Sequence, residues 1–268
     1  MVRIVVSAPQ GKMGKAISQA ACADSRFSIV AGLGPEGRGY IGKDIGLVAG
    51  LGQELGASVQ DDAGKALTLC DVVIDFSTRQ GSLRILEAAL VHKKAVVCGT
   101  TGFSVAEREL FVQASRHIPV MLAANTSKVV HCMNRLLEIC ARELGADADI
   151  EILEMHDRGK LDAPSGTSKE MGALLAHTMG KDIAELAVYG REGHQPRTPG
   201  SIGYHSIRSG STLSSHMVSF GFMGERLEIA HHAQDWLCFA RGACEAALFL
   251  HQQPAGLYGI QDCFNASN

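Results

Sequence analysis

Short apolar runs alternate with amphipathic segments along the first half of the chain. Apolar and β-branched residues predict strands at residues 2–7, 27–33, 72–76, 95–98 and 120–123. Apolar residues spaced three or four apart predict helices between them, at residues 12–23, 81–92 and 105–115. Strands that alternate with helices pair in parallel with right-handed crossovers. We therefore expect a Rossmann-type, doubly wound parallel sheet of the α/β class, with helices on both faces.

The pattern changes after Asn125. Helices are predicted at residues 128–144 and 164–179, and strands at residues 150–155, 202–209, 216–222 and 226–232. This order predicts an open mixed sheet with one or two helices, which makes the second region α+β in type. Residues 238–251 predict a last apolar helix that returns to the first domain.

Composition narrows the class of protein. The chain has 268 residues, of which 46% are hydrophobic and 20% charged, as in ordinary globular proteins. A formal net charge of −3 gives no reason to expect nucleic acid or an anionic membrane as a partner. The sequence shows no secretory leader and no apolar stretch near the roughly 20 residues of a membrane helix. Eight cysteines without a C-x-x-C pair, most of them inside apolar runs, indicate buried, reduced thiols, so we expect a cytoplasmic protein.

The turn after the first strand predicts a phosphate-binding site. Gly11-Lys12-Met13-Gly14 opens the first helix, where glycine lets the backbone approach a pyrophosphate and the helix N-terminus favours negative charge. The local sequence S-A-P-Q-G-K-M-G lacks the complete G-x-G-x-x-G fingerprint, so a structural turn without a ligand is the alternative. Its place directly after the first strand favours a dinucleotide cofactor.

The end of the second strand bears on the choice of cofactor. An acidic residue there bonds a ribose hydroxyl and favours NAD. Glu36 offers such an acceptor, whereas Arg38 and Lys12 offer positive charge for the 2′-phosphate of NADP. The pattern therefore predicts NADH or NADPH without deciding between them.

Two more loops follow predicted strands and are candidates for the nicotinamide end of the cofactor. These loops are Gly99-Thr100-Thr101-Gly102 and Ala124-Asn125-Thr126-Ser127. Ligands of open α/β sheets bind beyond the carboxyl ends of the strands, which is where both loops are expected. Plain turn chemistry is the alternative, because Gly, Thr and Asn favour turns in any case.

The densest chemistry lies at residues 154–167, with the sequence E-M-H-D-R-G-K-L-D-A-P-S-G-T. His156 and Lys160 can neutralise charge or donate a proton, and the helix start at Ser165-Gly166-Thr167 can hold a carboxylate. We therefore predict a small anionic substrate here. A solvated charged loop before a capped helix is the alternative. One histidine among scattered aspartates lacks the spacing of metal ligands, so no metal is expected.

The same run resembles the signature of the dihydrodipicolinate reductase family, E-x-H-H-x-x-K-x-D-x-P-S-G-T. Further segments resemble the family in the same order along nearly the whole chain. They are the G-K-M-G turn, DVVIDFS at 71–77, GTTGF at 99–103, AAN at 123–125, REGH at 191–194, PGSIG at 199–203 and GERLEIAH at 224–231.

The resemblance implies a dinucleotide-binding domain at residues 1–126 plus 236–268. It implies an inserted domain at residues 127–235 for substrate binding and homotetramer contacts. The implied activity is NADH- or NADPH-dependent reduction of 4-hydroxy-tetrahydrodipicolinate to tetrahydrodipicolinate, in lysine and diaminopimelate biosynthesis.

Individual roles also follow from the resemblance. His156 is similar to the family's proton donor, and Lys160 to its second essential side chain. Asp157, Ser165, Gly166 and Thr167 fall at substrate-binding positions. The positions similar to cofactor contacts are Gly11, Met13, Gly14, Gly99, Thr101 and Ala124.

Departures from the family pattern predict altered substrate binding. They are Ala8 for the first glycine of the turn, Asp157 for the second histidine, the loop at 125–129, Trp236 for an arginine and Ser211 near a usual acidic residue. An ionised Asp157 would repel a dicarboxylate, and Trp236 removes a compensating cation. Either Asp157 makes a structural pair, for instance with Arg158, or the substrate carries less negative charge.

Three functions are therefore compared. The first is the reductase of the family, and the second is a diverged reductase of another cyclic imine or carbonyl compound. The third is a cofactor-binding or assembly protein without turnover. His156 and Lys160 argue against the third, because such a protein has no chemical need for both side chains.

Overall fold

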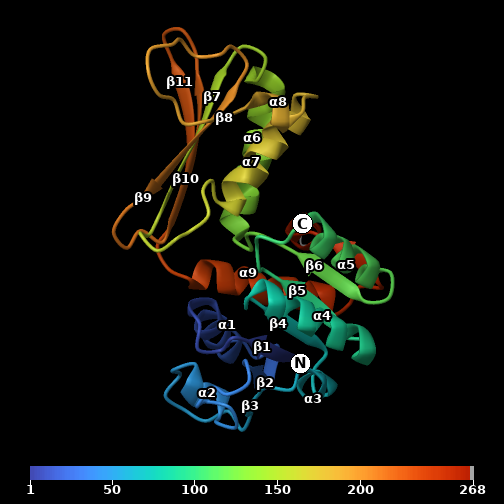
Figure 1. The fold of residues 1–268 in the computed structure, drawn as a ribbon. Helices are drawn as coiled ribbons and strands as arrows, with labels where there is room; N and C mark the ends of the chain where they lie inside the picture. The colour runs from blue at the N-terminus through green and yellow to red at the C-terminus, as the bar shows by residue number, and fades with distance from the viewer. Residues whose placement is uncertain (266–268) are drawn as a thin grey trace. The chain divides into compact units, whose positions relative to one another are not determined.

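The structure, a computed structural model, describes residues 1–265 and divides into two compact units (Figure 1). Unit 1 consists of Met1–Lys128 together with the described residues from Trp236 onward, and unit 2 consists of Val129–Asp235. The domain boundaries predicted from the sequence fall after residues 126 and 235.

Unit 1 contains a seven-stranded sheet in the order β12-β6-β5-β4-β1-β2-β3, and every pair of neighbouring strands is parallel. The strands are β1 (Val2–Ser7), β2 (Phe27–Leu33), β3 (Val59–Gln60), β4 (Val72–Asp75), β5 (Ala95–Cys98), β6 (Pro119–Leu122) and β12 (Gly256–Tyr258). Apart from β12, this is the strand order of a Rossmann sheet. The expected fold class of this half is thereby confirmed.

Helices cover both faces of this sheet (Figure 1). One face packs against α1 (Lys12–Cys22), α9 (Leu237–Leu250) and α10 (Ile260–Asn265). The other packs against α3 (Ala63–Thr68), α4 (Arg79–His92) and α5 (Val105–Ser115). A strand buried on both faces has no polar side to show, which is why the central strands read as continuous apolar runs. The return of α9 to unit 1 confirms the expectation for the last apolar helix.

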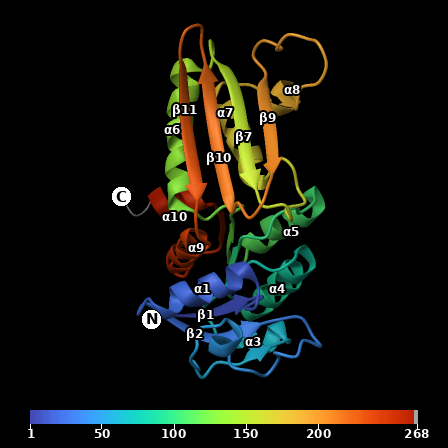
Figure 2. The same cartoon turned by 90° about the vertical axis from the view of Figure 1, so that its left-hand side faces the viewer.

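Unit 2 contains a mixed five-stranded sheet in the order β11-β10-β7-β9-β8. Its strands are β7 (Asp149–His156), β8 (Ala187–Tyr189), β9 (Ile202–Arg208), β10 (Ser214–Gly221) and β11 (Arg226–Ala233). The strands β7, β9 and β8 run parallel, whereas β10 is antiparallel to both β7 and β11. The helices α6 (Lys128–Leu144) and α7 (Gly166–Thr178) cover one face (Figure 2). The expected mixed α+β region is confirmed.

Several predicted boundaries are wrong by one or two residues, and caps explain two of them. The helix expected from residue 164 begins at Gly166, because Ser165 is its extended N-cap and accepts from the Ser168 N–H. The helix expected from residue 81 begins at Arg79, because Thr78 caps it in the same way. Short elements without a readable period escaped prediction; besides β3, β8, β12, α3 and α10 these are α2 (Ile45–Val48) and α8 (Ile183–Leu186).

Along residues 1–265, no helix combines the length and apolar character needed to cross a bilayer. The same residues contain no cluster of three or more His, Cys, Asp or Glu side chains placed to hold a metal ion. Cysteine burial is only partly as expected, because Cys22 and Cys132 are exposed.

Candidate active site

The turn after β1 is tightly packed. Ala8 adopts φ +46°, and its carbonyl accepts a 2.8 Å hydrogen bond from the Gly11 N–H. A Cβ atom on Gly14 would lie 2.1 Å from that same carbonyl oxygen and 2.8 Å from Cα of Pro9. Only glycine at residue 14 lets α1 begin this close to the turn, which is the packing role of the third glycine in dinucleotide-binding turns. The geometry therefore fits a pyrophosphate-binding turn despite Ala8.

Trp236 adjoins this turn. The Nζ atom of Lys12 lies 5.5 Å from the centroid of its indole ring, within the range of a cation–π contact. Trp236 belongs to unit 1, where it directly precedes α9 and packs against Phe239. Glu36 and Arg38 are both exposed in the loop after β2. Each side chain is therefore accessible to a cofactor, Glu36 for a ribose hydroxyl and Arg38 for a 2′-phosphate.

A buried carboxylate joins the carboxyl ends of three neighbouring strands. Asp75, at the end of β4, is fully buried and accepts from the Ser7 hydroxyl at 2.5 Å and from the Ser77 N–H at 3.1 Å. The Ser82 hydroxyl of α4 also contacts it, and lies 2.9 Å from Oγ1 of Thr100 in the loop after β5. This network fixes the loop edge at which a Rossmann sheet binds its ligand.

The two candidate loops after β5 and β6 are held differently. Gly99 is buried against the ring of Phe76. A Cβ atom at residue 99 would lie 2.0 Å from Cε1 of that ring, so no larger residue fits there. Thr101 is exposed in the same loop. After β6, Ala124 is half-buried, and the Asn125 side chain accepts from the Ser127 N–H at 2.8 Å.

The Thr126 hydroxyl donates to the carbonyl of Phe239 at 2.7 Å, which ties the loop after β6 to α9. A Cβ atom on Gly242 of α9 would lie 1.6 Å from the Thr126 carbonyl oxygen. The Thr126 side chain thus has a structural role, which accounts for one of the departures of this loop from the family pattern.

His156 and Glu154 form the centre of the candidate site in unit 2. Both side chains point to the helix-covered face of β7, since residues two apart on a strand share a face. Nδ1 of His156 lies 2.6 Å from Oε2 of Glu154, and the Glu154 side chain is almost wholly buried. Burial lowers the pKa of His156, although the adjacent carboxylate opposes that shift.

Arg208, at the end of β9, neutralises Glu154. Its two terminal nitrogens lie 2.8 Å from the two carboxylate oxygens, a bidentate pair. Burial disfavours ionisation of Glu154, but hydrogen bonds from Arg208, Ser206 and His156 outweigh it and lower its pKa to about 2. The Arg208 guanidinium also donates to the Asp162 carbonyl at 2.6 Å, which anchors the loop that carries Lys160.

The loop after β7 presents Lys160. Oδ1 of Asp157 accepts from the Gly159 N–H at 2.8 Å, and the Asp157 carbonyl accepts from the Lys160 N–H at 3.2 Å. Asp157 therefore stabilises the turn, the structural alternative expected from the sequence, but through Gly159. Nζ of Lys160 lies 2.8 Å from a carboxylate oxygen of Asp162, which is half-exposed.

The helix start at Ser165 is buried beside a second histidine. The Ser165 hydroxyl lies 3.1 Å from Nε2 of His216, and the Ser165 N–H donates to Oε1 of Glu154 at 3.3 Å. The His216 and His156 rings meet edge to face, with centroids 5.3 Å apart. Burial lowers the pKa of His216 to about 3, so its imidazole is neutral near pH 7. Gly166 and Thr167 follow in the first turn of α7.

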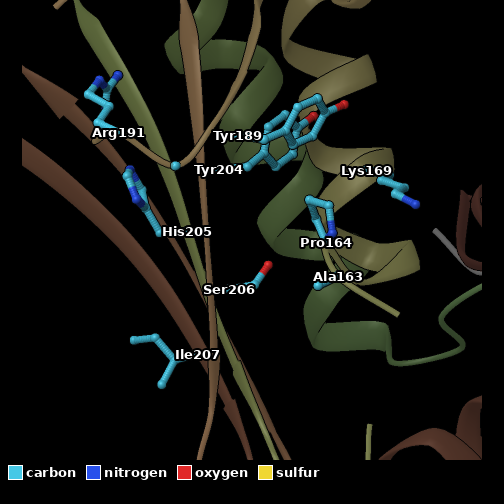
Figure 3. A pocket seen from close by; sticks show the side chains of 10 residues that line it. Ala163, Pro164, Lys169, Tyr189, Arg191, Tyr204, His205, Ser206 and Ile207 are labelled. Atoms are coloured by element: carbon cyan, nitrogen blue, oxygen red, sulfur yellow. The ribbon is translucent and has the colours of Figure 1, made fainter. Parts of the chain in front are cut away.

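A cavity of about 690 Å³ lies in unit 2 next to the end of the Lys160 loop (Figure 3). Ala163 and Pro164 line it, together with the stacked rings of Tyr189 and Tyr204 and the side chain of Lys169. His156, Lys160 and Ser165 are not among its lining residues. The cavity borders the His156 cluster at Ser206, whose side chain hydrogen-bonds Glu154.

The structure brings the predicted His156, Lys160 and Ser165 together around one loop. Sequence reasoning missed Arg208 and His216 and gave Glu154 no role. The two-residue spacing of Glu154 and His156, at the end of the strand predicted for residues 150–155, was the signal for their pairing. No sequence signal joined Arg208 and His216 to them, because they come from β9 and β10, which follow β7 by about 50 residues.

Comparisons with known proteins agree along the whole chain. The family described as dihydrodipicolinate reductase, N-terminus, matches residues 2–126, and dihydrodipicolinate reductase, C-terminus, matches residues 129–264. The 4-hydroxy-tetrahydrodipicolinate reductase of Hahella chejuensis is 40% identical over 263 residues, which cover 98% of both chains. That of Pseudomonas fluorescens is 42% identical over 264 residues, again covering 98% of both.

A solved structure shares the fold. The dipicolinate-bound dihydrodipicolinate reductase from Paenisporosarcina sp. TG-14 matches with a TM-score of 0.72 and 21% identity, over 97% of both chains. Both halves of the sequence match the family, and two relatives are at least 40% identical over nearly the full length. The chain belongs to the dihydrodipicolinate reductase family.

Proposed function

We propose that this protein reduces 4-hydroxy-tetrahydrodipicolinate to tetrahydrodipicolinate with NADH or NADPH, in lysine and diaminopimelate biosynthesis. The observation that carries the proposal is its 40–42% identity, over 98% of both chains, to two 4-hydroxy-tetrahydrodipicolinate reductases. These relatives favour the family reaction over a diverged reductase and over a protein without turnover. His156, Lys160 and the Ser165 helix start, gathered in unit 2, supply the chemical groups that this reaction needs.

Unit 1 is proposed to hold the cofactor. The glycine-rich turn after β1 and the α1 N-terminus would receive its pyrophosphate, and the loops after β5 and β6 its nicotinamide end. Glu36 would accept from a ribose hydroxyl, and Arg38 or Lys12 would pair with a 2′-phosphate. The proposed contacts are Gly11, Lys12, Met13, Gly14, Glu36, Arg38, Gly99, Thr101, Ala124 and Asn125.

Unit 2 is proposed to hold the substrate. The first turn of α7, at Ser165, Gly166 and Thr167, would bind one carboxylate, because its N–H groups and helix dipole favour an anion. Lys160 would stabilise negative charge on the substrate. Asp157 lies at the edge of this group and shapes the turn that carries Lys160.

The reduced nicotinamide supplies a hydride when it is bound. His156, once protonated from solvent on both ring nitrogens, would donate the proton that balances this hydride. The substrate hydroxyl leaves as water together with a proton from the adjacent ring carbon. One hydride and one proton are thus taken up for each water released. General acid assistance of this kind is worth about 10²–10⁴-fold in rate.

The assay that tests the proposal generates the substrate in the cuvette from pyruvate and aspartate semialdehyde with a purified synthase. We expect oxidation of NADH or NADPH that depends on this chain. His156→Ala should lower kcat by about 10²-fold or more while changing KM little. A folded, cofactor-binding protein that leaves the coenzyme unoxidised would contradict the proposal.

Assembly and location complete the proposal. The family resemblance supports a homotetramer built through unit 2, and sedimentation of the purified chain measures it. We also place the protein in the cytoplasm, as its cysteine usage predicts.

A further inference from the structure

Both oxygens of the Glu154 carboxylate are held by hydrogen bonds with neighbouring groups. Oε2 faces Nδ1 of His156 at 2.6 Å, and Oε1 accepts from the Ser165 N–H at 3.3 Å. Arg208 holds both oxygens in a bidentate pair at 2.8 Å. With 2% of its surface exposed, Glu154 has little access to water, so these contacts determine that its carboxylate is ionised.

These contacts also decide where His156 carries its proton. An ionised carboxylate only accepts hydrogen bonds, so Nδ1 of His156 must be the donor in the 2.6 Å contact. The neutral imidazole then has its acceptor at Nε2. Charged groups act on the ring from other elements as well: Lys160 from the following loop and Arg208 from β9, with neutral His216 on β10. These cations offset the negative charge of Glu154.

We propose that Glu154 is a positioning residue: it holds the Nδ1 proton of His156 and leaves Nε2 as the atom that exchanges a proton with the substrate. This inference rests on the proposed function for the role of Nε2. The tautomer itself follows from the contacts within unit 2. By accepting also from the Ser165 N–H, the same carboxylate links the orientation of His156 to the carboxylate-binding helix start.

Glu151 provides a matched control on the same strand. Like Glu154, it is held by arginine and histidine side chains, here two arginines and one histidine: Arg191 at 2.7 Å, Arg197 at 3.0 Å and His205 at 2.7 Å. Hydrogen bonds from these partners outweigh burial and lower its pKa to about 2 as well. Glu151 points to the opposite face of β7, away from His156, because residues of odd offset on a strand alternate. Glu151 thus has the same kinds of ion-pair partners as Glu154 but does not contact His156.

The first measurement is the tautomer of His156 in the intact protein, from the ¹⁵N shifts of its two ring nitrogens near pH 7.5. A His156→Gln spectrum assigns its signals among the 11 histidines. We expect a neutral ring protonated at Nδ1. A ring protonated at Nε2 overturns the proposal. This readout needs no substrate, so it stands even if the proposed reaction fails.

The second measurement compares Glu154→Gln with Glu151→Gln in the coupled assay. For Glu154→Gln we expect kcat to fall at least about 10–100-fold, the effect of removing a carboxylate that orients a metal-bound histidine, with KM within threefold. Glu151→Gln should keep kcat within twofold, and Glu154→Asp should recover part of the loss. Equal losses in both glutamine variants, or normal kcat in Glu154→Gln, would overturn the proposal. If Glu154→Gln does not fold, the tautomer and the Glu154→Asp rate decide it.

Discussion

The Ser7 hydroxyl donates a 2.5 Å hydrogen bond to the buried carboxylate of Asp75, joining the ends of β1 and β4. The same hydroxyl oxygen accepts from the Phe76 N–H at 3.1 Å. The Phe76 ring in turn packs against Gly99. Ser7 and Phe76 together thus hold β1, β4 and the loop after β5 at the edge of the sheet where we place the cofactor.

Asp75→Ala should destabilise unit 1. The substitution leaves the Ser77 N–H and two serine hydroxyls without their acceptor. We expect the free energy of unfolding to fall by at least about 3 kcal/mol, because each of the three stranded donors costs about 1–3 kcal/mol. Urea unfolding measures this change, with the exposed Asp61→Ala as control. Equal unfolding midpoints for the two variants would argue against the network.

Gly14→Ala should weaken cofactor binding without unfolding the chain. The new Cβ atom would meet backbone atoms of the turn at 2.1 and 2.8 Å, so the turn or the start of α1 must move. We expect Kd for the reduced cofactor to rise at least about tenfold, equivalent to about 1.4 kcal/mol. Calorimetric titration measures it. Gly64→Ala is the control, because its nearest neighbours are side-chain ends at 3.3 and 3.4 Å. An unchanged Kd in Gly14→Ala would remove the turn from the proposed site.

Glu36→Ala and Arg38→Ala should shift cofactor preference in opposite directions. Loss of Arg38 removes positive charge for a 2′-phosphate, so NADPH affinity should fall several-fold while NADH affinity changes little. Loss of Glu36 removes an acceptor for the ribose hydroxyl, so NADH affinity should fall instead. The ratio of the two Kd values in each variant checks this expectation. A ratio that is the same in both variants would exclude these side chains as determinants of preference.

The local character of the patterns explains which features could be predicted from the sequence. The buried strands of unit 1 are apolar runs, and His156, Lys160 and Ser165 lie within one run of 14 residues, so both were readable. The two-residue strand β3 is too short to show a period. The pairing of Glu154 with Arg208 depends on β7 and β9 lying side by side, which no local pattern records. Likewise, only the fold places Trp236 beside Lys12.

Asp157→Asn should improve substrate binding slightly. The amide keeps an oxygen to accept from the Gly159 N–H, so the turn that presents Lys160 persists, while a negative charge near an anionic substrate is removed. At a half-exposed position such a charge is worth about 0.2–1 kcal/mol, so KM should fall by up to about fivefold at unchanged kcat. Asp157→Ala, which also loses the turn contact, should not show this gain. A raised KM in Asp157→Asn would mean that the charge itself serves the site.

His216 should make folding sensitive to mild acid. Burial lowers its pKa from the ordinary 6.5 to about 3, so between these values the unfolded chain binds a proton that the folded chain does not. Stability is therefore complete above about pH 6.5 and declines as pH falls towards 3. At 1.36 kcal/mol per pH unit, this histidine alone should lower the free energy of unfolding by about 2 kcal/mol at pH 5 relative to pH 7.

Urea midpoints of wild type and His216→Gln at pH 7 and 5 isolate this contribution. The window stays above the ordinary glutamate pKa of about 4.3, near which the unfolded chain protonates Glu154 and Glu151. In the folded protein the pKa values of both carboxyls are lowered to about 2. His216→Gln should be less stable at pH 7, because it loses the contact with Ser165, yet should decline less on acidification. Burial also lowers the pKa values of His156 and His231. The stability of His216→Gln should therefore still decline somewhat between pH 7 and pH 5. The exposed His194→Gln should retain the full decline, and an equally steep decline in His216→Gln would show that the acid sensitivity arises elsewhere.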